Sequence, residues 1–138
     1  MGGKHTLVIK AELSKLEEIR RFIESSAKSL RADGRAISDL RLAVDEAVTN
    51  IIAYGYQNRQ GTIEISIDRD ADALIVCLRD TAAHFDPSSY VASDQRALPE
   101  REAAGGFGIP LIKQVVDEVS YRVPDAGGNE LTLIKHTE

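Results

Sequence analysis

Two side chains that could act together, a carboxylate and an amide, stand four residues apart at Glu46 and Asn50. They fall within residues 37–56, where apolar residues recur with the period of a helix. Side chains at this spacing are neighbours on a helix, and this pair lies on the flank of the apolar stripe. A carboxylate and an amide at that edge can face a cleft between this helix and its neighbour, as the polar groups of a functional site do.

The alternative is that both side chains belong to the solvated side of an amphipathic helix, which is the commoner arrangement for an arbitrary helix. Asn has low helix propensity, and Leu42, Asp45 and Thr49 already supply the fully exposed face. These observations favour a functional role, although the pair alone does not establish one.

Glycines in the run GGFG, at Gly105, Gly106 and Gly108, stand where a helical pattern begins with Pro110 in its first turn. Such glycines let the backbone approach a ligand and present unpaired N–H groups, which is a phosphate-binding arrangement. The alternative is a flexible hinge. The run lacks the Gly-Lys-Ser/Thr of a Walker A loop, and no strand directly precedes it as in a dinucleotide fingerprint.

Two more polar residues stand on predicted strands. Asp80 lies where a central strand gives way to a loop, and a carboxylate there can accept a hydrogen bond from the exocyclic amine of a base. In isolation an Asp at this place more often begins a turn. Thr132 alternates with Leu131 and Leu133 on the last strand and, taken alone, is structural.

The segments that must position these residues follow from the apolar patterns. Strands are predicted at residues 6–11, 61–69, 73–79, 119–123 and 130–136. The second and third of these should form a hairpin across Asp70-Ala71-Asp72. Residues 81–104 are polar with little strand periodicity, and a loop of that length in a small domain is often a functional lid.

The helix boundaries have sequence signals of their own. Ser14 and Glu17 predict a capping box at the start of the first helix, and Asp33-Gly34 predicts its end. The helix over residues 37–56 should stop at Gly55 in a left-handed cap. With the helix after the glycine run, the fold class is α+β: a two-layer sandwich in which three helices cover one face of a mostly antiparallel, mixed sheet.

Composition limits the class of protein further. The 138 residues suit one domain, residues 1–138, with 43% hydrophobic and 28% charged residues. The net charge of −5 argues against nucleic-acid binding, and no apolar run is long enough to cross a membrane. The absence of a signal-peptide pattern predicts a cytoplasmic protein. The lone Cys77 and the scattered histidines offer no metal-ligand spacing.

The motifs in this order resemble a known family. The chain is similar to the small anti-sigma-factor serine/threonine kinases (RsbW/SpoIIAB-like) of the GHKL ATPase superfamily, whose domain has the Bergerat fold. LAVDEAVTNIIAYGY resembles the N-box of that family, LRDTAAHFDP its first glycine box, GGFGIPLIKQVVDEV its second, and GNELTLIK its closing strand. The resemblance covers almost the whole chain, and the combination is specific although each motif is weak.

The resemblance implies a role for each candidate residue in binding ATP and Mg²⁺. Asn50 would help to hold Mg²⁺ against the ATP phosphates, and Glu46 would be the base that polarises the attacking hydroxyl. Asp80 would accept a hydrogen bond from the adenine amine, with Thr132 supporting that bond. The glycines implied to bring the backbone to the phosphates are Gly105, Gly106 and Gly108. Phosphoryl transfer needs mainly positioning and charge neutralisation, for which this set suffices.

One residue departs from the family pattern. Members usually carry a glycine two residues after the adenine-binding aspartate, whereas this chain has Ala82. The added methyl group could crowd the nucleotide or restrict the backbone of the loop.

The resemblance also implies partners and leaves alternatives open. The partner would be a small antagonist protein (anti-anti-sigma type) that accepts the phosphoryl group, with a sigma factor as a further partner and a homodimer as the family's usual state. The main alternative is a non-catalytic, nucleotide-responsive module that switches partners. A histidine-kinase catalytic domain is disfavoured, since no phosphoacceptor or dimerisation helix pair precedes the first predicted strand.

Overall fold

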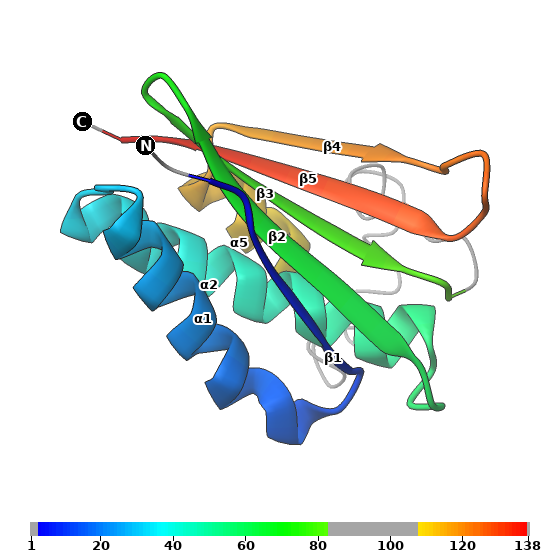
Figure 1. Cartoon of the computed structure of the whole chain (residues 1–138). Coiled ribbons are helices and arrows are strands. Elements are labelled where there is room, and N and C mark those ends of the chain that lie inside the picture. The colour runs from blue at the N-terminus through cyan, green and yellow to red at the C-terminus, as the bar shows by residue number, and fades with distance from the viewer. Residues whose placement is uncertain (1–2, 83–107, 138) are drawn as a thin grey trace.

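The computed structural model describes residues 3–82 and 108–137. Five strands within these ranges form one sheet in the order β1-β2-β3-β5-β4, and every pair of neighbours is antiparallel. The strands are β1 (His5–Lys10), β2 (Thr62–Asp70), β3 (Ala73–Asp80), β4 (Glu118–Arg122) and β5 (Asn129–His136). The α-helices are α1 (Leu16–Ser29), α2 (Gly34–Asn50) and α5 (Gly108–Val115). They cover one face of the sheet, so the predicted α+β sandwich is confirmed (Figure 1). Within the described residues the sheet is entirely antiparallel rather than mixed.

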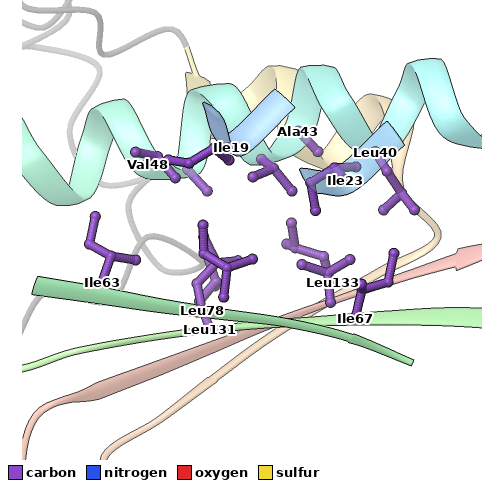
Figure 2. Packing of buried hydrophobic residues seen from close by; sticks show 14 of the residues in the cluster. Ile19, Ile23, Leu40, Ala43, Val48, Ile63, Ile67, Leu78, Leu131 and Leu133 are labelled. Carbon is purple, nitrogen blue, oxygen red and sulfur yellow. The ribbon is translucent and has the colours of Figure 1, made fainter. Parts of the chain in front are cut away.

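The core lies between the helices and the sheet because each contributes an apolar face (Figure 2). Alternation along β2 turns Ile63, Ile65 and Ile67 inward, and all three side chains are fully buried. The apolar stripe predicted for the helix over residues 37–56 is confirmed. Its buried members are Ile37, Leu40, Val44, Ala47, Val48 and Ile51.

Strand β3 lies at the centre of the sheet, between β2 and β5. The predicted hairpin is confirmed: Asp70 pairs with Ala73, and Ala71 in the turn adopts a left-handed backbone with φ of 56°. Alternation along β3 turns its last residue, Asp80, to the same side as the buried Leu78. The strand pattern thus directs a carboxylate towards the layer of helices.

Helix α2 begins before the predicted residue 37. Asp33 is its N-cap, and the Asp33 carboxylate accepts a hydrogen bond from the backbone N–H of Ala36 at 2.8 Å. The prediction that Asp33-Gly34 ends the first helix is therefore wrong, because α1 already ends at Ser29 and Asp33 starts the next helix. A side-chain hydrogen bond also ties Asp33 to Thr137 near the end of β5, at 3.0 Å.

The predicted capping box is also wrong. A 3₁₀ turn over Leu13–Lys15 precedes α1, which makes Lys15 the N-cap and leaves no side chain capping the helix. The Ser14 hydroxyl turns back to the Glu12 carboxylate, at 3.4 Å. The capping pattern fails because the chain tightens before the helix begins, which moves the first helical residue past Ser14.

The end of α2 differs from the prediction as well. After Asn50 the chain continues as a π-helix, η2 (Ile51–Gly55), and Gly55 does not adopt a left-handed backbone. Left-handed φ values of 55° and 63° occur two and three residues later, at Gln57 and Asn58. The chain therefore turns away after the π-helix, and the π-helix follows the candidate residue Asn50 directly.

The remaining elements complete the platform for the site. Helix α5 packs against α2, and its described residues follow the glycine run, where a helix was predicted. Most of the loop predicted at 81–104 lies outside the described residues. Across residues 3–82 and 108–137, the helices are too short or too polar to cross a membrane.

Candidate functional site

The tertiary structure brings the end of α2 to the end of β3. A small pocket lies there, in which the centre of a water molecule has about 10 Å³ of space. It is lined by Ala47, Asn50, Ile51, Asp80, Tyr121, Asn129 and Leu131. Two of the predicted site residues, Asn50 and Asp80, thus share one pocket although they come from different layers.

The Asn50 side chain is buried without hydrogen-bond partners. The residue is 1% exposed, and neither its Oδ1 nor its Nδ2 has a hydrogen-bond partner among residues 3–82 and 108–137. Among the described residues only Asn50 leaves both side-chain polar atoms in this state; Arg41 and Asp45 each leave one. A buried polar group without a partner costs about 1–3 kcal/mol. An amide kept at that cost on the wall of a pocket is suited to a bound cation or polar ligand.

Asp80 is 9% exposed and already partly satisfied. Its Oδ1 accepts hydrogen bonds from the Asn129 side-chain amide at 2.8 Å and from the Ala82 backbone N–H at 2.9 Å. No hydrogen bond from another described residue reaches Oδ2, which leaves this oxygen as an acceptor for a ligand. Burial raises the pKa of Asp80 above its ordinary value, and the two hydrogen bonds partly oppose that shift.

Replacing Asp80 by Asn is expected to raise the urea midpoint at neutral pH. Asn keeps an Oδ1 acceptor for both donors but carries no charge to desolvate. Because the folded-state pKa is raised above 3.8, the parent loses stability as pH rises from 3.8 through that folded pKa. The advantage of the variant should be complete above the folded pKa and absent below 3.8. Urea unfolding of both proteins across this range tests it, and a variant less stable than the parent at neutral pH would contradict it.

Thr132 does not lie beside Asp80, so the prediction that it supports the hydrogen bond of Asp80 is wrong. In the register of β3 and β5, Asp80 pairs with Asn129, whereas Thr132 pairs with Cys77. Thr132 alternates with the buried Leu131 and therefore faces away from the helices. The residue that supports Asp80 is Asn129.

Asn129 links Asp80 to the neighbouring strand. Its amide N–H group also reaches the Ala82 carbonyl oxygen at 3.2 Å, and its Oδ1 accepts a hydrogen bond from the Tyr121 hydroxyl on β4. The preceding Gly128 has φ of 81°, and a Cβ there would collide with the Asp80 carbonyl oxygen. The glycine pair in GGNE was the available sequence signal for this close approach.

Charged side chains hold the same end of the sheet from its other face. Glu130 follows Asn129 and accepts hydrogen bonds from Arg79 at 2.8 Å and from Arg122 at 2.7 Å. Arg79 also reaches Glu64 on β2 at 2.9 Å. This ladder crosses four strands with alternating charge, and hydrogen bonds from the two arginines lower the pKa of Glu130. It secures the register that pairs Asp80 with Asn129.

Glu46 lies one helical turn before Asn50 and is partly buried. No hydrogen bond or ion pair ties its carboxylate to another described residue. Burial raises the pKa of Glu46, and the neighbouring Asp45 carboxylate raises it further. Asp45, expected to be fully exposed, is instead half-buried against α1, where it accepts a hydrogen bond from Arg20 at 2.8 Å. Glu46 is therefore a carboxylate of raised pKa that has no partner among the described residues.

Ala82 lies against the π-helix. The residue is 9% exposed, and a Cβ built on Gly55 would stand 3.2 Å from the Ala82 methyl carbon. The methyl group that departs from the family pattern thus occupies the space left by a glycine in η2. Gly105 and Gly106 lie outside the described residues, and their contact with phosphate stays a prediction.

Glu46 and Asn50 thus lie on the last turns of α2, and Asp80, at the end of the central strand β3, shares a pocket with Asn50. A model of the histidine kinase-like ATPase domain matches residues 9–135 of this chain. The chain therefore belongs to the family of histidine kinase-like ATPase domains.

Its similarities lie with RsbW and anti-sigma F factors. Serine-protein kinase RsbW of Oceanobacillus iheyensis is 32% identical over 89 residues, which cover 61% of this chain and 56% of RsbW. The anti-sigma F factor of Bacillus licheniformis is 28% identical over 103 residues, 72% of this chain and 69% of that factor. A similar factor of Thermoanaerobacter pseudethanolicus is 23% identical over 117 residues, 85% of this chain and 82% of that factor.

A solved structure has the same fold. The crystal structure of the RsbU and RsbW domains of a Mycobacterium tuberculosis protein matches with a TM-score of 0.65 at 16% sequence identity. The match covers 98% of this chain and 32% of that longer one. This chain thus spans about half the length of the Oceanobacillus RsbW and about a third of the solved chain.

Proposed function

We propose that this protein is an ATP-dependent serine/threonine protein kinase that regulates a partner as an anti-sigma factor does. The observation that carries the proposal is the Asn50 amide, which is 1% exposed and whose two polar atoms find no partner in the described part of the chain. It shares a pocket with Asp80, whose Oδ2 is available to a donor. An amide oxygen is a suitable ligand for Mg²⁺, and a carboxylate oxygen is a suitable acceptor for the adenine amine.

Each residue has one task in this proposal. Asn50 would hold Mg²⁺, and Asp80, supported by Asn129, would accept the hydrogen bond of the adenine amine. Glu46 would orient the acceptor hydroxyl and take its proton, for which its raised pKa suits it. Mg²⁺-ATP, when bound, supplies the phosphoryl group and neutralises its charge. Gly108 at the start of α5 would lie near the phosphates.

The partners are proposed from the names of the relatives. Relatives called serine-protein kinase and anti-sigma F factor indicate a protein acceptor with a serine or threonine and a sigma factor as a binding partner. The acceptor would be a small antagonist of the anti-anti-sigma type. A homodimer and a cytoplasmic location remain part of the proposal.

Calorimetric titration with ATP, with and without Mg²⁺, tests the binding step, and radiolabelled phosphate transfer to a candidate antagonist tests the chemistry. We expect Mg²⁺-dependent binding and label on the antagonist. Asp80→Asn is the matched variant: an Asn N–H group facing the base repels the adenine amine and suits the guanine oxygen, so preference for ATP over GTP should fall. Absence of binding at millimolar nucleotide would refute the proposal. Binding without transfer to any antagonist of the same cell would favour a non-catalytic switch.

A further inference from the structure

Tyr56 stands at the exit of the π-helix that follows Asn50. Its backbone N–H donates to the Ile51 carbonyl oxygen at 2.8 Å, which closes the last wide turn of η2. The residue is 8% exposed, and its ring lies so close to Gly61 that any side chain there would collide with it. The position of the Tyr56 side chain is thus set from both ends, by the π-turn and by the glycine.

The Tyr56 hydroxyl joins three parts of the chain. It donates to the Thr62 carbonyl oxygen at the start of β2, at 2.6 Å. It accepts a hydrogen bond from the backbone N–H of Thr81 at 2.9 Å and lies 3.3 Å from the Thr81 hydroxyl. Thr81 is the residue directly after Asp80. A single hydroxyl therefore connects the end of the Asn50 helix to the end of the Asp80 strand.

The turn after Asp80 depends on the same backbone. The Ala82 N–H donates to Asp80 Oδ1 at 2.9 Å, and this bond orients the carboxylate so that Oδ2 remains open. Thr81 lies between these two residues, so release of its N–H from Tyr56 would let the turn rotate. On the β5 side, the Asn129 side-chain amide donates to Asp80 Oδ1 at 2.8 Å. On the helix side, Tyr56 supports the carboxylate indirectly, through its hydrogen bond with the Thr81 N–H.

We propose that Tyr56 is a positioning residue: its hydroxyl sets the orientation of the Asp80 carboxylate relative to Asn50 and thereby sets selectivity for the base of the nucleotide. The selectivity part rests on the proposed nucleotide-binding function. Tyr56 touches no reacting atom in this role, because it acts through Thr81 and Asp80.

A matched pair of variants separates positioning from general stabilisation. Tyr56→Phe keeps the ring against Gly61 and removes only the hydroxyl. Thr137→Val also removes a hydroxyl that both accepts and donates a hydrogen bond, but at the far end of the sheet. The Thr137 hydroxyl accepts from the Asp33 N–H at 2.9 Å and donates to the Asp33 carboxylate at 3.0 Å. Both variants lose buried hydrogen bonds of a hydroxyl, but only the first should disturb the turn at Asp80.

The first measurement is amide hydrogen exchange at Ala82, whose N–H donates to Asp80 Oδ1 and not to the Tyr56 hydroxyl. Tyr56→Phe should speed exchange there by roughly 2- to 10-fold, the equivalent of one hydrogen bond, after correction for the change in global stability. Thr137→Val should change it by no more than that correction. Unchanged exchange at Ala82 in Tyr56→Phe would overturn the positioning role, and this result needs no nucleotide.

The second measurement is the ratio of ATP affinity to GTP affinity. Tyr56→Phe should lower this ratio by roughly 2- to 10-fold. Asp80→Asn is expected to lower the ratio as well, whereas Thr137→Val should leave it unchanged. A ratio that falls in Asp80→Asn but not in Tyr56→Phe would overturn the selectivity role. If the parent binds no nucleotide, the proposed function and the selectivity role both fail, and the exchange result alone decides whether Tyr56 positions Asp80.

Discussion

Glu46→Gln should slow phosphate transfer to the antagonist by about 10²–10⁴-fold, the usual scale of general-base assistance. Gln keeps the size and hydrogen-bonding capacity of Glu but cannot accept the proton of the acceptor hydroxyl. ATP affinity should stay close to that of the parent, because Glu46 is partly exposed and lies one turn before Asn50, outside the pocket wall. Single-turnover transfer of labelled phosphate, with nucleotide affinity measured on the same samples, gives both numbers.

The pH dependence supplies the control for Glu46. Because its pKa is raised by burial and by Asp45, the base should become protonated, and transfer should slow, at a higher pH than for an ordinary Glu. Asp45→Asn removes one of these causes and should move the acidic limb of the rate profile to lower pH. A Glu46→Gln variant that transfers phosphate at the parental rate would remove Glu46 from the mechanism.

Asn50→Leu should abolish most Mg²⁺-dependent ATP binding and yet make the unliganded protein more stable. Loss of even a second-shell group commonly lowers metal affinity by about 10–100-fold, so loss of a direct ligand should cost at least that much. Stability should rise by about 1–3 kcal/mol, since Leu has nearly the same shape and no polar atoms left unpaired. Urea unfolding without ligand and calorimetry with Mg²⁺-ATP measure the two effects.

Asn50→Asp is the matched variant for this experiment. It keeps the size and an oxygen ligand but adds a buried charge, so the protein without ligand should lose stability, and Mg²⁺ should restore more of it than in the parent. If Asn50→Leu were less stable than the parent and bound Mg²⁺-ATP equally well, Asn50 would be a structural residue with a partner in solution.

Asn50 and Asp80 have a common property that supports this proposal. Each is buried at a cost to the folded state: the amide lacks partners, and the carboxylate has a raised pKa. Polar groups that a fold would be more stable without are often kept for binding. The opposite responses of stability and affinity predicted for Asn50→Leu and Asp80→Asn are the direct test of that relation.

Local pattern was sufficient for the framework of this protein. Two patterns predict which side of an element faces the core. They are the alternation of Ile63, Ile65 and Ile67 on a strand and the helical stripe that ends near Ile51. Because that pattern has a fixed period, it also placed Glu46 and Asn50 at the edge of the stripe and Asp80 at the end of a central strand. Those inferences need no knowledge of what lies across the core.

Contacts between distant segments were decided only by the tertiary structure. Whether Asn129 or Thr132 lies opposite Asp80 depends on the register of β3 against β5, and alternation is the same in every register shifted by two residues. The π-turn after Asn50 and the Tyr56–Thr81 hydrogen bond likewise depend on how the helix end packs beneath the sheet. The period of a sequence determines which face of an element is buried, whereas register and helix ends are set by the partner that packs against it.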